Sequence, residues 1–136
     1  MWPARSSLKW IGAAAVLCCL IIATAAALAW SSSRRQSHLA RTITGGNPTR
    51  ASAIMRRYGC GGCHTVAGIP GADGQVGPPL SGLIHRVYIG GVATNSPDHL
   101  IQWIVDPQKL SSRSAMPATG ISEAEARDVA AYLYEH

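Results

Sequence analysis

The chain of 136 residues contains no phenylalanine, and tryptophan and tyrosine contribute only four residues each. Large aromatic side chains contribute strongly to the energetics of most cores, and this chain supplies little aromatic mass of its own. Cysteine is also scarce, with four residues in all. Two of these, Cys18 and Cys19, lie in an apolar run. The sequence therefore excludes the disulfide framework that is typical of small secreted domains.

Acidic residues are absent from the first 41 positions, which carry five of the twelve Lys and Arg residues. The other seven basic residues share positions 42–136 with all seven acids, so this part has no net charge. Its single lysine is Lys109. The folded part is thus not expected to carry a basic patch, and we predict that it binds no nucleic acid. Electrostatic steering of a partner should be weak.

The apolar run extends from Trp10 to Trp30 and contains no charged residue. It is long enough to cross a bilayer as one helix, and tryptophan at both ends suits the two membrane interfaces. We predict that residues 1–30 form a single transmembrane anchor. A cleaved signal peptide is the alternative, because residues 27–29 (Ala-Leu-Ala) are a plausible cleavage site. The mature protein would then be a soluble periplasmic one.

A polar stretch rich in serine and arginine follows, and it predicts a flexible linker over residues 31–46. The remainder, residues 47–136, is long enough for one small folded domain. Within it, Asn47 and Pro48 suit the N-cap and the first position of a helix that runs to about Tyr58. Gly59 should end this helix.

Two further helices are predicted in this domain. One follows Ser96 and ends at Asp106, because the next residue is a proline. The last begins at Ser122, where Glu125 completes a capping box. Residues 108–120 look like a loop. Taken together, the pattern predicts an all-α domain.

The segment over residues 65–95 contains seven glycines and predicts a long loop. A structureless stretch of this length is unusual in a compact domain. It is understandable if the chain wraps a large apolar cofactor. Such a cofactor would also supply the aromatic mass that the sequence lacks.

Residues 60–64 read Cys-Gly-Gly-Cys-His, the pattern of covalent haem c attachment. The two thiols can form thioethers with the two vinyl groups of one porphyrin, and the histidine can then bind the iron. A structural zinc site would need a second pair of ligands, and a thioredoxin-like motif would accompany βαβ units. We predict one haem c, attached through Cys60 and Cys63, with His64 as an axial ligand.

The other face of the iron needs a second ligand or stays open. Met116, directly before Pro117 in the loop that precedes the last helix, is our predicted ligand. Met55 is too close in sequence to Cys60 to cross easily to that face, and it suits core packing. A bis-histidine site through His85 or His99 is an alternative. If no side chain binds the iron on this face, the site could instead belong to a redox enzyme or a gas sensor.

Four features together resemble the class I c-type cytochromes over residues 48–134. They are the motif at residues 60–64, Gly-Pro-Pro-Leu at residues 77–80, Met-Pro at residues 116–117 and the closing helix with its Tyr-Leu at residues 132–133. The resemblance implies a small all-α fold in which the first and last helices cross beside the haem. That family usually places an aromatic residue of the first helix at the crossing, whereas this chain offers Ile54 or Met55.

The resemblance also implies roles for residues around the haem. The carbonyl of Pro78 would accept a hydrogen bond from His64 and orient its imidazole. Leu80 completes the Gly-Pro-x-Leu motif and is expected to contact the haem. Trp103 is a candidate partner of a haem propionate, together with two further residues, Arg86 and Tyr88.

With both axial positions filled, the iron cannot bind a small-molecule substrate, so we expect an electron carrier and not an enzyme. Haem c is attached outside the cytoplasm, which places the domain on the periplasmic side of the inner membrane behind a single-pass anchor. By analogy with the family, we expect a quinol-oxidising complex as donor and a terminal oxidase of a respiratory chain as acceptor. A fixed electron-relay subunit of a larger oxidase or dehydrogenase is the alternative.

Overall fold

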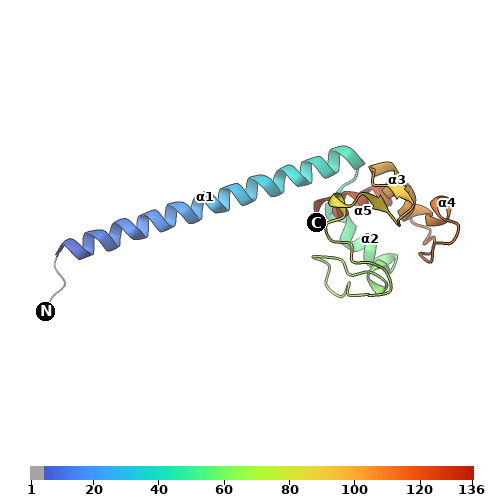
Figure 1. Cartoon of the computed structure of the whole chain (residues 1–136), viewed down its shortest axis with the longest axis horizontal. Helices are drawn as coiled ribbons and strands as arrows, with labels where there is room; N and C mark the ends of the chain where they lie inside the picture. The colour runs from blue at the N-terminus through green and yellow to red at the C-terminus, as the bar shows by residue number, and fades with distance from the viewer. Residues whose placement is uncertain (1–4) are drawn as a thin grey trace. The chain divides into compact units, whose positions relative to one another are not determined.

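The computed structural model describes the backbone of residues 5–136 and the side chains of residues 10–136. Residues 1–4 of the predicted anchor lie outside the described residues. The chain divides into two compact units, Met1–Arg35 and Gln36–His136, which are described separately below. Helices dominate both units (Figure 1).

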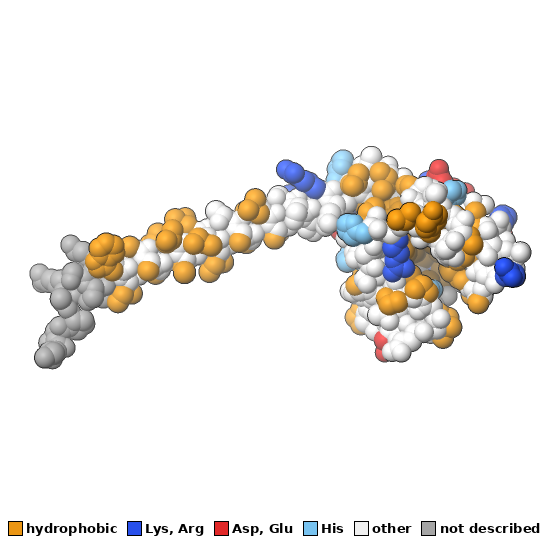
Figure 2. All heavy atoms as spheres, viewed as in Figure 1, with side chains coloured by type: hydrophobic (Ala, Val, Ile, Leu, Met, Phe, Trp, Pro, Cys, Tyr) orange, Lys and Arg blue, Asp and Glu red, His pale blue; other side chains and the backbone are white. Residues whose placement is uncertain are grey.

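The described residues of the first unit all belong to one helix, α1 (Arg5–Thr44), which begins in this unit and ends in the second. From Trp10 to Trp30 its side chains are exposed and mostly apolar (Figure 2). Within the described residues it is the one helix that is long and apolar enough to cross a membrane, a property that a signal sequence near the N-terminus shares.

The three helices predicted for the second unit are confirmed. The first consists of a 3₁₀ turn, η1 (Pro48–Arg50), and α2 (Ala51–Arg57). The second is α3 (Pro97–Val105), and the last is α5 (Glu123–Glu135). Their caps are those expected, because Asn47, Ser96 and Ser122 each accept a backbone N–H with the side chain.

The remaining elements are short. They are η2 (Cys60–Gly62), η3 (Leu83–His85), the two-residue strands β1 (Tyr88–Ile89) and β2 (Ala93–Thr94), and α4 (Pro107–Leu110). The strands pair antiparallel, with Tyr88 opposite Thr94. The loop predicted for residues 108–120 is wrong at its start, where α4 lies. Pro107 ends α3, but proline is also favourable at the first position of a new helix.

α5 is the centre of the second unit, since both α2 and α3 pack against it (Figure 1). Ile54 and Met55, the two residues of α2 that this chain offers instead of the family's usual aromatic residue, are buried in the shared core. The Tyr134 hydroxyl donates to Asn95 Oδ1 over 2.7 Å. Burial raises the pKa of Tyr134 to about 12, so this hydroxyl remains a neutral donor at physiological pH.

The flexible linker predicted for residues 31–46 is wrong, because α1 continues as a helix to Thr44. Ala40 and Thr44 are almost fully buried in the second unit. The Thr44 hydroxyl donates to Ala40 O over 2.6 Å and accepts from Gly46 N at 3.1 Å. Polar composition suggested a coil, but burial of one face stabilises a helix beyond its intrinsic propensity.

Residues 36–46 contact α5 directly. Arg127 Nη1 donates to Thr44 O over 3.1 Å, and the Ser37 hydroxyl donates to the Glu135 carboxylate. A Cβ on Gly46 would lie 2.0 Å from Arg127 O. Only glycine therefore permits this approach of the two backbones, and residues 36–46 belong to the folded domain.

Candidate haem site

A mainly apolar cavity of about 360 Å³ lies between α2, α3, α5 and the loops of the second unit. Its lining includes all seven predicted site residues, which are Cys60, Cys63, His64, Pro78, Leu80, Trp103 and Met116. Arg86 and Tyr88 line it as well. The alternative ligands, His85 and His99, are not among the residues that line the cavity. Instead, His99 Nδ1 lies 2.8 Å from Thr94 O.

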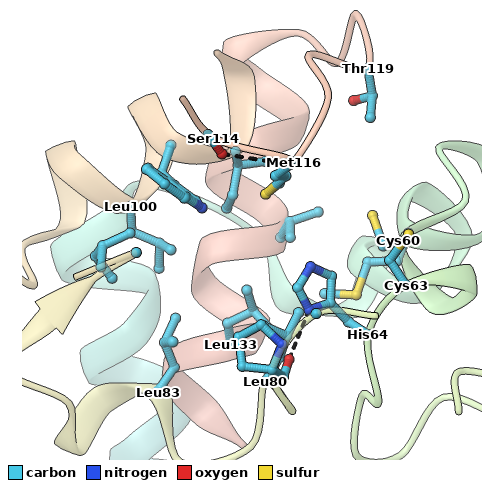
Figure 3. Close-up of a pocket in the computed structure, with 18 of the residues that line it drawn as sticks. Cys60, Cys63, His64, Leu80, Leu83, Leu100, Ser114, Met116, Thr119 and Leu133 are labelled. Carbon is cyan, nitrogen blue, oxygen red and sulfur yellow. Dashed lines mark hydrogen bonds between the residues drawn. The ribbon is translucent and has the colours of Figure 1, made fainter. Parts of the chain in front are cut away.

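The Cys-x-x-Cys-His segment follows directly from the end of α2. Gly59 has a φ of 71° and turns the chain into η2. His64 N and Cys63 N then both donate to Cys60 O, over 3.0 and 3.3 Å. This tight turn gathers two free thiols and one imidazole at the cavity (Figure 3). Burial raises the pKa of the Cys60 thiol, which therefore stays protonated at neutral pH.

The imidazole of His64 is fixed by the loop that follows. Its Nδ1 lies 2.8 Å from Pro78 O. A carbonyl only accepts hydrogen bonds, so Nδ1 carries the proton and Nε2 keeps a free lone pair for a metal. Gly77 N donates to Cys63 O over 2.8 Å and holds the loop against the ring. A Cβ on Gly77 would lie 2.3 Å from His64 Cε1, so the loop can make this contact only with glycine.

Met116 reaches the cavity from a different segment, the loop between α4 and α5. Figure 3 shows its sulfur and the His64 ring entering the same pocket from separate parts of the chain. Trp103 enters from α3. A Cβ on Gly90 would lie 2.3 Å from Trp103 Cη2, so the turn between β1 and β2 packs closely on the indole.

The donor set fits a haem c. Two thiols can form thioethers, and a nitrogen and a thioether sulfur, from His64 and Met116, are available for iron. The surrounding wall is mostly apolar, as a porphyrin requires. Arg86, one candidate for a propionate contact, donates to the carbonyls of Pro79 and Ser81. Its guanidinium thus braces the loop that carries Pro78.

Sequence reasoning missed a polar network at the cavity wall. Tyr58, which lines the cavity, donates from its hydroxyl to Glu125 Oε2 over 2.9 Å. The other carboxylate oxygen accepts from Arg57 over 2.7 Å. The sequence indicates Glu125 only as part of the capping box with Ser122. A hydrogen bond from Ser122, and to a smaller extent one from Tyr58, lowers the pKa of the Glu125 carboxyl.

This lowered pKa predicts a pH dependence of stability. The Glu125 carboxylate stabilises the folded domain fully above the ordinary carboxyl pKa of 4.5, and this stabilisation is lost as the pH falls below it. Thermal unfolding of Glu125→Gln should therefore show a lower midpoint than wild type at pH 7 and a smaller fall at acid pH. Asp73→Asn, at an exposed carboxylate whose side chain makes no hydrogen bond or ion pair in the described part of the chain, is the control. An equal acid-induced fall in wild type and Glu125→Gln would contradict the prediction.

Comparison with known protein families gives the class of this chain. Residues 48–136 match the family described as Cytochrome c. The chain therefore belongs to the cytochrome c family and is a class I c-type cytochrome. It is an electron carrier and not an enzyme, its cofactor is covalently bound haem c, and redox proteins are its partners. No curated protein and no solved structure matched it.

Proposed function

We propose that the protein is a membrane-tethered cytochrome c with a single haem c, working on the extracytoplasmic side of the inner membrane. Cys60 and Cys63 would form the two thioethers, and His64 and Met116 would ligate the iron. The observation that carries the proposal is the arrangement of these four side chains around one apolar cavity. The haem, when bound, supplies a one-electron redox centre.

The surrounding residues tune and shield this centre. Pro78 orients the imidazole of His64 through its carbonyl and raises the basicity of the ligand nitrogen. Leu80 and Trp103 contribute to the wall that keeps water from the iron. A thioether ligand such as Met116 favours ferrous iron and raises the reduction potential.

Docking of the redox partners is expected to be largely apolar. Val76 and Tyr88 line the cavity and are 86% and 57% exposed, so both present apolar surface to solvent beside it. Lys109, the only lysine of the domain, lies 3.7 Å from the Asp106 carboxylate. These features support partners whose docking surface is also apolar, and an electron-transfer rate that depends weakly on salt. We assign a quinol-oxidising complex as donor and a terminal oxidase as acceptor.

A second candidate is a fixed electron-relay subunit of a larger complex. The observation that favours it is the short connection between the apolar run and the folded domain. Only residues 31–35 separate Trp30 from the second unit, which begins at Gln36. Five residues span at most about 18 Å even when fully extended. A tether this short limits the partners that the domain can reach.

The test of the main proposal uses native membranes that contain the full-length protein. The haem is reduced, oxygen is admitted, and reoxidation is followed with and without cyanide. Fast reoxidation that cyanide blocks is expected for an electron carrier that feeds a terminal oxidase. Membranes from cells that lack this chain are the control. A haem that stays reduced under oxygen would rule out the oxidase as acceptor.

The same membranes distinguish the two candidates. Solubilised in mild detergent, a relay subunit should co-purify in stoichiometric amount with large membrane subunits, whereas a free carrier should not. The mass of the purified chain shows in addition whether residues 1–30 are retained. Loss of this segment would support the soluble periplasmic form.

A further inference from the structure

The loop that carries Met116 makes few hydrogen bonds. In the described structure, residues 115–121 take part in two, and both join Met116 to residues that precede the loop, Gln108 and Ser114. Pro117 has no N–H to donate, and Gly120 adopts a φ of 79°. Ile121, at the far end, is buried. The backbone of Met116 is therefore held mainly by these two bonds.

Gln108 of α4 supplies the shorter of the two. Its Nε2 donates to Met116 O over 2.7 Å and to Ser114 O over 3.2 Å. Both partners are carbonyl oxygens, which only accept, so the amide must point its NH₂ group toward them. Met116 N in turn donates to Ser114 Oγ over 3.2 Å. Gln108 thus fastens the turn from Ser114 to Met116 onto α4.

α4 is a fixed support for this contact. Pro107, its first residue, is among the most completely buried side chains of the domain. Ser111 N donates to Pro107 O over 2.9 Å and closes the helix. α4 also packs against α3. Gln108 itself is exposed, so its replacement opens no cavity in the core.

We propose that Gln108 is a positioning residue for the Met116 sulfur, and that it sets the fraction of time for which this sulfur occupies the sixth position of the iron. The inference rests on the proposed ligation by His64 and Met116. The net contribution of such a hydrogen bond corresponds to a change of about 2- to 12-fold in an equilibrium constant. Loss of Gln108 should shift the loop toward conformations in which the sulfur is off the iron by this factor.

The decisive variant in the full-length haem protein is Gln108→Glu. Glutamate has the same size, but at pH 7 it is ionised, donates no hydrogen bond and repels the two carbonyl oxygens. We expect the far-red sulfur–iron band of the ferric protein to weaken. Carbon monoxide should bind the ferrous protein about 2- to 12-fold faster. Gln108→Lys keeps a donor at this position and should restore most of the band.

The matched control is Gln102→Glu. Gln102 is an exposed residue of α3, and its side chain makes no hydrogen bond in the described part of the chain. Its variant should keep the band and the carbon monoxide rate of the wild type. If wild type shows the band and Gln108→Glu keeps it unchanged, the role of Gln108 is overturned while ligation by Met116 stands. If wild type lacks the band, or Met116→Ala retains it, the ligand assignment itself is wrong and both proposals fail.

Discussion

Replacing Gly77 with alanine should displace the imidazole of His64, and the protein should lose the low-spin spectrum of a histidine-ligated haem. The new Cβ would lie 2.3 Å from His64 Cε1 and 2.6 Å from Nδ1. The loop cannot retreat freely, because Gly77 N donates to Cys63 O. Overpacking costs about 1–3 kcal/mol, roughly a 5- to 150-fold bias toward states in which the ring has left this position.

The matched control for this variant is Gly62→Ala within the haem motif. A Cβ on Gly62 meets no atom within 4 Å, and its φ is not in the left-handed region. Its spectrum should be that of the wild type. Haem content is measured with the pyridine haemochrome assay, and absorption spectra of both variants are compared at equal haem concentration. A wild-type spectrum for Gly77→Ala would show that the loop yields more easily than these contacts imply.

Removing residues 36–46 should lower the thermal midpoint of the haem domain by about 10 °C. A chain that begins at Asn47 loses the buried side chains of Ala40 and Thr44 and the bonds from Arg127 and Ser37. These contacts are worth roughly 2 kcal/mol together, and 1 kcal/mol shifts the midpoint of a domain of this size by about 4–8 °C. A chain that begins at Gln36 keeps all of them and is the reference.

A point variant separates packing from chain length. Thr42 and Thr44 each donate a hydroxyl hydrogen bond to the carbonyl four residues earlier, over 2.8 and 2.6 Å. Thr42 is exposed, whereas Thr44 is fully buried. Thr44→Ala should therefore lower the unfolding midpoint, and Thr42→Ala should not. Equal midpoints for the two truncated chains would mean that residues 36–46 are only a connection.

The parts of the fold that the sequence predicts correctly are those in which neighbouring residues determine the structure. The capping box at Ser122 and Glu125, the cap at Asn47 and the left-handed Gly59 each follow from contacts within a few positions. The end of α1 does not, because Ala40 and Thr44 become buried only when α5 is present. The composition of residues 31–46 does not indicate that α5 packs against them.

The residues of the candidate site also fall into two groups, those that the sequence indicates and those that it does not. The residues of the haem motif and the Gly-Pro-x-Leu segment are recognisable because their spacing is fixed by one chemical group. Gln108 and the pair of Tyr58 and Glu125 act through partners 8 and 67 residues away. In the sequence these side chains look like ordinary polar residues on or beside a helix, and nothing there indicates their partners. Their role becomes visible once the loop of Met116 and the start of α5 are placed in space.

The five residues between the apolar run and the folded domain, residues 31–35, also affect how the haem domain encounters its redox partners. With α1 anchored as proposed, the haem domain cannot leave the layer of water next to the lipid. Encounters with other membrane proteins then occur by lateral diffusion, and their frequency scales with the number of complexes per unit area of membrane. Expanding the volume of the compartment that holds the haem domain should leave the rate of electron transfer unchanged. Diluting the membrane with added lipid should slow a free carrier and leave a fixed relay unaffected.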